Sequence, residues 1–87
     1  MTETPAEGWA AFPAQFEMEA FDDFASLPEH VQRCLDDAIG ELEWAPQPPD
    51  AADVESAVRS VLRCGHEIVY SMEEGYLVIW GFEKISL

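Results

Sequence analysis

Two cysteines and two histidines carry the widest range of chemistry in this sequence. His30 and Cys34 are four residues apart, which places both on one face of a helix, and a single glycine separates Cys64 from His66. If the first pair packed beside the second, the four side chains would offer the ligands of a tetrahedral zinc site. The same arrangement would allow Cys34 to act as a nucleophile with His66 as its base.

A simpler interpretation leaves both cysteines as free thiols. Cys34 falls within an apolar helical stripe, where a free cysteine packs as a small hydrophobe. The spacing of Cys64 and His66 is tighter than that of a standard zinc finger or ribbon, and no third group that would orient the histidine is visible. We therefore predict no metal, no cofactor and no catalytic residue, and the two cysteines suit a reducing cytoplasm better than a disulfide scaffold.

The charge of the chain is strongly negative and unevenly distributed. Eighteen acidic and four basic side chains give a net charge of −14. Residues 1–55 hold 14 acidic and one basic side chain, or −13, whereas residues 56–87 hold four acidic and three basic, or −1. Such a field repels phosphate backbones and attracts basic surfaces. We therefore expect a basic protein partner and no direct binding of nucleic acid.

The strongest secondary-structure signal is a β-hairpin over about residues 67–82. Its arms, residues 67–72 and 76–82, are rich in β-branched and aromatic side chains. Residues 73–75 are expected to form a three-residue loop, with Gly75 at the positive φ that such a loop needs. The second arm is apolar on both faces, so other elements must cover it.

Helices are expected to supply that cover. Apolar residues recur at helical spacing in residues 17–26, 27–43 and 51–63. The second of these segments opens with Ser26 and Glu29 three residues apart, which is the pattern of a capping box. The chain should then be a single α+β domain in which two to three helices pack on a small C-terminal antiparallel sheet.

The N-terminal region is less regular. Residues 1–8 are expected to be flexible and residues 9–87 to form the single domain. Residues 9–16 contain Pro13, so they are expected to be extended, either as a third strand at the sheet edge or as a loop pinned by aromatic residues. No apolar run approaches a membrane span and no signal peptide is visible, which predicts a soluble cytoplasmic protein.

Two segments together resemble the RelE/ParE toxin superfamily. Residues 24–32, Phe-Ala-Ser-Leu-Pro-Glu-His-Val-Gln, resemble the "LPxxV" junction between the first two helices of that family. Residues 68–80 resemble its closing hairpin, of the form "RIVYxxxxGxLVIL". The resemblance covers about half of the chain. It implies a helical pair packed on a C-terminal antiparallel sheet.

The chemistry of that family is not matched by this chain. The resemblance implies ribosome-dependent ribonucleases that cleave RNA with Arg, Lys, His or Tyr at the end of the hairpin, often after a Gly-His-Arg-like step. The corresponding residues 81–84 are Gly-Phe-Glu-Lys, and the whole chain holds four cations. Phosphodiester chemistry needs cations to hold phosphate and stabilise developing charge. Residues 51–63 are also expected to be helical where the family has a strand, so we predict a similar fold without the ribonuclease activity.

The sequence therefore predicts a small, acidic, non-enzymatic binding protein. It would dock on a nuclease, toxin or nucleic-acid-binding protein as an inhibitor or immunity-type protein that mimics nucleic acid. The docking surface is expected on the first two helices, at Asp22, Asp23, Asp36, Asp37, Glu41, Glu43 and Trp44. Tryptophan is enriched at binding hot spots, although Trp44 would also suit a cap over the edge of the core.

Two alternative functions stay open at this point. The chain would be a RelE/ParE-like toxin–antitoxin component, an mRNA interferase or a gyrase poison, if its expression arrested growth through Arg59, Arg63 or Lys84. It would be a structural homodimer if the apolar outer face of the hairpin paired with a second copy.

Overall fold

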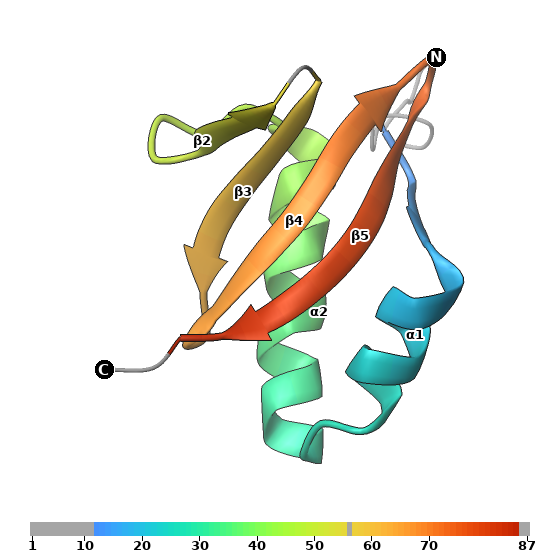
Figure 1. Cartoon of the computed structure of the whole chain (residues 1–87), viewed down its shortest axis with the longest axis vertical. Helices are drawn as coiled ribbons and strands as arrows, with labels where there is room; N and C mark the ends of the chain where they lie inside the picture. The colour runs from blue at the N-terminus through green and yellow to red at the C-terminus, as the bar shows by residue number, and fades with distance from the viewer. Residues whose placement is uncertain (1–11, 56, 86–87) are drawn as a thin grey trace, which may run out of the picture.

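Five strands form one mixed sheet, and two helices pack against one of its faces (Figure 1). The computed structural model describes residues 12–55 and 57–85. Its elements are β1 (Ala14–Phe16), α1 (Met18–Ala25), α2 (Glu29–Trp44), β2 (Ala52–Glu55), β3 (Val58–Arg63), β4 (His66–Glu73) and β5 (Tyr76–Lys84). The strand order is β1-β5-β4-β3-β2, with β1 parallel to β5 and the other neighbours antiparallel. The predicted α+β class, with helices on a mainly C-terminal sheet, is confirmed.

The core lies between α2 and the inner face of the sheet. Leu35 of α2 is fully buried, as are Ile68 and Tyr70 of β4 and Ile79 of β5. The inward positions of β4 alternate with outward ones, because successive side chains of a strand point to opposite faces. The opposite face of the sheet, toward the viewer in Figure 1, is covered by neither helix. No described helix has the length and apolar content needed to cross a membrane.

The short helix α1 is attached to the sheet by an aromatic cluster. The ring of Phe24 lies 5.3 Å from that of Phe16 in β1 and 5.7 Å from that of Phe82 in β5. Such tilted and edge-to-face arrangements are the favoured geometry of aromatic pairs. Phe21, which shares the predicted apolar stripe, is instead 57% exposed.

The predicted capping box at the start of α2 is wrong. The Ser26 hydroxyl donates to the carbonyl oxygen of Asp23 at 2.9 Å, and the Ser26 backbone N–H closes the end of α1. Pro28 is the residue before α2, which therefore begins without a side-chain capping bond. The serine is committed to the preceding helix, and the fixed φ of proline helps to set the start of the next one.

The predicted third helix over residues 51–63 is also wrong, because this segment forms β2 and β3. The two strands pair as a hairpin, with Ala57 between them at a φ of 67°. β3 pairs in turn with β4 along its whole length, from Val58 opposite Ser71 to Arg63 opposite His66. A valine-rich segment favours a strand when a partner strand is available, here β4. The apolar spacing of this segment fits both a helix and a strand, so the sequence pattern alone does not distinguish them.

The predicted C-terminal hairpin is confirmed, with two changes of detail. Its turn has two residues, Glu74 and Gly75, and not three, and Gly75 has the expected positive φ of 89°. The register shifts by one residue at Trp80, so β5 contains a β-bulge. Of the two alternatives for residues 9–16, the strand is present over Ala14–Phe16 as β1, whose Ala14 lies opposite Leu77, and residues 9–11 lie outside the described residues. The expectation of a flexible segment at residues 1–8 lies outside the described residues.

Candidate functional site

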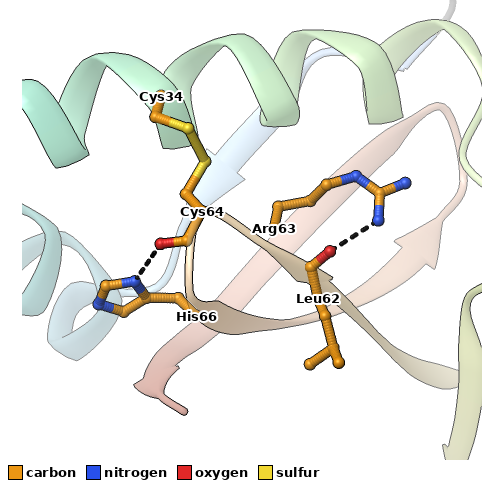
Figure 2. Close-up of a disulfide and its surroundings, with 5 residues drawn as sticks. All are labelled: Cys34, Leu62, Arg63, Cys64 and His66. Carbon is orange, nitrogen blue, oxygen red and sulfur yellow. Dashed lines mark hydrogen bonds between the residues drawn. A yellow bond between two sulfur atoms is a disulfide. The ribbon is translucent and has the colours of Figure 1, made fainter.

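Cys34 and Cys64 form a disulfide that joins α2 to the turn between β3 and β4 (Figure 2). The expectation of two free thiols is therefore wrong. Thirty residues separate the two cysteines, so the contact depends on how β3 and β4 pack on α2. With their sulfurs bonded to each other, neither cysteine is a zinc ligand or a nucleophile in this structure.

His66 lies beside the disulfide and is 7% exposed. Its Nδ1 atom is 3.0 Å from the carbonyl oxygen of Cys64. A carbonyl oxygen only accepts hydrogen bonds, so Nδ1 is the donor in this contact. In the neutral tautomer that has its proton on Nδ1, the other nitrogen, Nε2, is an acceptor. His30 is exposed in the first turn of α2. The described residues contain no group of three or more His, Cys, Asp or Glu side chains that could hold a metal ion.

Three potentially functional side chains share one row across the end of the sheet. Arg63 of β3 lies opposite His66 of β4, which lies opposite Lys84 of β5. Residues directly opposite each other in an antiparallel pair point to the same face, here the inner one. Arg63 and His66 nevertheless extend in different directions (Figure 2). At the end of the hairpin the row therefore leaves Lys84 as the basic residue opposite His66 in the register.

Arg63 turns away because it is paired with Asp50. Two of its guanidinium nitrogens contact the two carboxylate oxygens at 2.6 and 3.2 Å. This hydrogen-bonded pair lowers the pKa of Asp50 and raises the pKa of Arg63. A bidentate pair of this kind keeps the guanidinium occupied within the chain.

Most of the cations are occupied in the same way. Arg33 pairs with Glu29 at 2.9 Å on the surface of α2, and Arg59 pairs with Asp53 at 2.8 Å across β2 and β3. Among the described residues, the exposed Lys84 is the basic side chain that takes part in none of the three ion pairs. Of the chain's four cations, Lys84 is therefore the best placed to meet a phosphate.

The uncovered face of the sheet carries a fixed tryptophan. The indole Nε1–H of Trp80 donates to the Ser71 hydroxyl oxygen at 2.8 Å, and that hydroxyl donates to Oε2 of Glu73 at 2.8 Å. Ser71 is 2% exposed although its strand position faces outward, whereas Trp80 is 46% exposed. Trp80 therefore points outward, and its bonding to Ser71 depends on the bulge, which the sequence did not reveal.

The predicted docking residues on the helices lie at the surface, with one exception. The exposed carboxylates of this surface, which we call the acidic helical surface, are Asp22, Asp23, Asp36, Asp37 and Glu41. Trp44 is 61% exposed at the end of α2, so it does not cap the core. Glu43 is half-buried and its Oε2 accepts a hydrogen bond from the Ala14 backbone N–H at 2.7 Å. Glu43 thus holds β1 against α2.

Carboxylates also occur away from the helices. The exposed acidic side chains of β2, β4, β5 and their turns include Asp53, Glu55, Glu73, Glu74 and Glu83. The negative charge is therefore densest on the helical side but is not confined to it.

Comparison with known proteins gives three similar folds. Neither a protein-family model nor a curated protein matches this chain. The isolated Escherichia coli RelE toxin superposes with a TM-score of 0.78 at 15% identity, over 88% of this chain and 87% of that one. The RelE–RelB complex from Pyrococcus horikoshii gives a TM-score of 0.68 at 13% identity, over 85% of this chain and 94% of that one.

The third neighbour is the toxin–antitoxin complex RelBE2 from Mycobacterium tuberculosis, with a TM-score of 0.74 and 18% identity over 85% of this chain and 98% of that one. Neighbours that are RelE toxins contradict our prediction of a non-enzymatic protein, and none of them supports the predicted inhibitor or immunity role. The β2–β3 hairpin removes the apparent difference from that family at residues 51–63. The resemblance noted in two sequence segments therefore extends to the whole arrangement of helices and strands, and this chain has a RelE-like fold.

Proposed function

We propose that this chain is the toxin-type component of a toxin–antitoxin pair and that it acts on RNA at the end of the β4–β5 hairpin. The observation that carries the proposal is the RelE-like fold, with a TM-score of 0.78 over 88% of the chain. The family resemblance implies cationic and imidazole side chains at the end of the hairpin. Lys84 and His66, which are opposite each other in the register of β4 and β5, are the residues of this chain that match that requirement.

The two side chains have complementary chemistry. The ammonium group of Lys84 would hold a phosphate oxygen and stabilise the negative charge that develops on it. The bare Nε2 of His66 would accept the proton of an attacking ribose hydroxyl, because Nδ1 is committed to the Cys64 carbonyl. His66 is 7% exposed, so RNA would reach only the edge of its ring.

The net charge restricts how RNA would arrive. A charge of −14 repels a free phosphate backbone, and three of the four cations are held in ion pairs within the chain. Binding of an RNA that is already held on a larger assembly would depend less on long-range electrostatic attraction between the RNA and this chain. We therefore expect activity on RNA held by the ribosome and little activity on free RNA.

Regulated expression of the chain tests the proposal. We expect wild-type chain to arrest growth, and Lys84→Ala to relieve the arrest by reducing RNA cleavage roughly 10²-fold, because one charge-stabilising donor is lost. Arg33→Ala is the matched control, since it removes an exposed cation that belongs to α2 and is already paired with Glu29. Cleavage is measured by mapping RNA 5′ ends after induction.

Two outcomes would contradict the proposed chemistry. Growth that continues unchanged while wild-type chain accumulates would exclude a toxin. Growth arrest that persists in Lys84→Ala and in His66→Gln would show that toxicity does not depend on these two residues.

We further propose that the partner is a basic protein attracted by the acidic helical surface. Two of the structural neighbours are complexes, one a toxin–antitoxin complex and the other a RelE–RelB complex, which supports a protein partner. The five carboxylates of this surface face solvent and the one basic residue of the helices, Arg33, is already paired. Exposed charges of one sign raise the rate of association with a partner of opposite charge. Salt weakens this attraction, because the screening length is about 8 Å at physiological ionic strength.

Amide substitutions of all five carboxylates test this second proposal. At low salt we expect association with the partner captured from host lysate to slow about tenfold, and the salt dependence to flatten. The control changes Glu55 and Glu74, which are exposed on the sheet side, to glutamine. Stopped-flow association rates at several salt concentrations give the answer. An association rate that is the same for both variants and wild type would place the attraction elsewhere.

A further inference from the structure

The uncovered sheet face has a regular arrangement of side chains that no helix contacts (Figure 1). Leu62 of β3 lies opposite Glu67 of β4, which lies opposite Glu83 of β5. One row further along, Val69 lies opposite Gly81. Within β3, β4 and β5 the outward-facing register positions include no lysine or arginine. The face is thus apolar with acidic side chains and has no cation of its own on these strands.

Trp80 is held in place on this face before anything binds. The bulge in β5 directs Trp80 and Gly81 to the same side, and the indole N–H is fixed by Ser71, which Glu73 holds in turn. The low exposure of Ser71 is explained by the indole that bonds to it and covers it. A side chain that is already ordered loses little conformational freedom on binding.

The space beside the indole is open. Apart from its chain neighbours Trp80 and Phe82, no residue has an atom within 4 Å of a methyl group placed on Gly81. Along β5 this gap lies between Trp80 and Glu83, and Glu83 faces Glu67 across the strand pair. Like charges directly opposite each other on a sheet repel, and no ion pair among the described residues relieves this one. In the register, Gly81 thus lies between the tryptophan and the pair of carboxylates.

The indole and the two carboxylates together favour an arginine as the bound group. An indole face attracts a cation, and guanidinium groups are found there more often than ammonium groups. Arginine also bonds carboxylates through a planar, bidentate arrangement that lysine cannot match. We propose that the uncovered sheet face binds a partner segment that presents an arginine between apolar side chains, with the arginine over Gly81 against Trp80, Glu67 and Glu83.

The inference rests on the proposed pairing with a basic partner and assigns it a contact surface. Charges on the acidic helical surface would speed the encounter, whereas the seated arginine would slow dissociation. A second copy of this chain is a poor occupant, because the face would meet its own carboxylates and the net charge is −14.

The test uses a synthetic peptide with one arginine and with leucine two residues before and two residues after it, so that all three share a face when the peptide is extended. The peptide is titrated into the isotope-labelled full chain and followed by NMR. We expect saturable shifts of the Trp80 indole signal and of the backbone amides of Gly81 and Glu83. The same peptide with citrulline in place of arginine should bind at least tenfold more weakly, since citrulline keeps the shape and loses the charge. Glu67→Gln with Glu83→Gln should weaken binding to a similar degree, whereas Glu55→Gln with Glu74→Gln should not.

Several results would overturn the inference. Shifts confined to the acidic helical surface, or equal binding of the citrulline peptide, would show that this face does not recognise arginine. Shifts that depend on protein concentration without peptide would identify a second copy as the occupant. Because the titration needs no toxin activity, its failure would leave the growth-arrest result standing, and the reverse also holds.

Discussion

Replacing Cys34 and Cys64 by serine is expected to lower the free energy of unfolding by about 3–4 kcal/mol. The disulfide closes a loop across a separation of 30 residues, and the chain-entropy model assigns roughly 3.6 kcal/mol to a loop of that length. The effect acts mainly on the unfolded chain, which gains conformations when the link is removed. Urea denaturation of wild type and variant measures it as a lower midpoint.

A reductant provides the control for this prediction. Treatment of wild-type chain with dithiothreitol should reproduce the midpoint of the serine variant, and the variant itself should not respond. A wild-type midpoint that is unchanged by reductant, with free thiols absent before treatment and present after it, would show that the link contributes no stability.

The disulfide also bears on the proposed site. It fixes the β3–β4 turn to α2, and Cys64 in that turn supplies the carbonyl that orients His66. Cys64 adopts a φ of 57° and Gly65 a φ of 74°. The turn therefore needs two consecutive residues in the left-handed backbone conformation, which residues other than glycine rarely adopt. A link at this point limits the motion of the histidine relative to the helix.

The elements that could be predicted from sequence are those with a local signal. The helix α2 has an apolar stripe of regular spacing, and the hairpin of β4 and β5 has two strongly β-forming arms around Gly75. Both signals are contained in a short segment, so no information about the rest of the fold is needed to read them. The family resemblance rested on this hairpin and on residues 24–32, which include the start of α2.

The elements that were missed depend on distant partners. β3 is a strand because it pairs with β4, and its valines fit a helical spacing equally well. The disulfide likewise arises because packing brings Cys64 to Cys34, and two cysteines alone do not predict a bond. Of the residues in the candidate sites, Arg63 shows the same dependence: its pairing with Asp50 requires the β2–β3 hairpin, which the disproved helix hid.

Replacing Tyr70 by alanine is expected to cost about 3–5 kcal/mol, as for other buried aromatic residues. Tyr70 is fully buried in β4 beneath α2, so truncation leaves a cavity at the centre of the core. Tyr70→Phe separates packing from hydrogen bonding. The phenol donates to the Pro46 carbonyl at 2.6 Å, and leaving that carbonyl unpaired should cost about 1–3 kcal/mol. Tyr76→Phe, at a half-buried position at the start of β5, is the matched control.

The same pair of variants predicts a change in alkaline stability. Burial raises the pKa of Tyr70 above the usual value for a phenol, so the folded chain keeps this proton at a pH where the unfolded chain has lost it. The contribution of Tyr70 is complete below the unfolded pKa and is lost as the pH rises through the raised folded pKa. Tyr70→Phe should therefore lose less stability than wild type between neutral and strongly alkaline pH, as measured by urea midpoints, while Tyr76→Phe follows wild type. Equal losses of stability in Tyr70→Phe and wild type would mean that deprotonation of the buried phenol does not cause the loss of stability at alkaline pH.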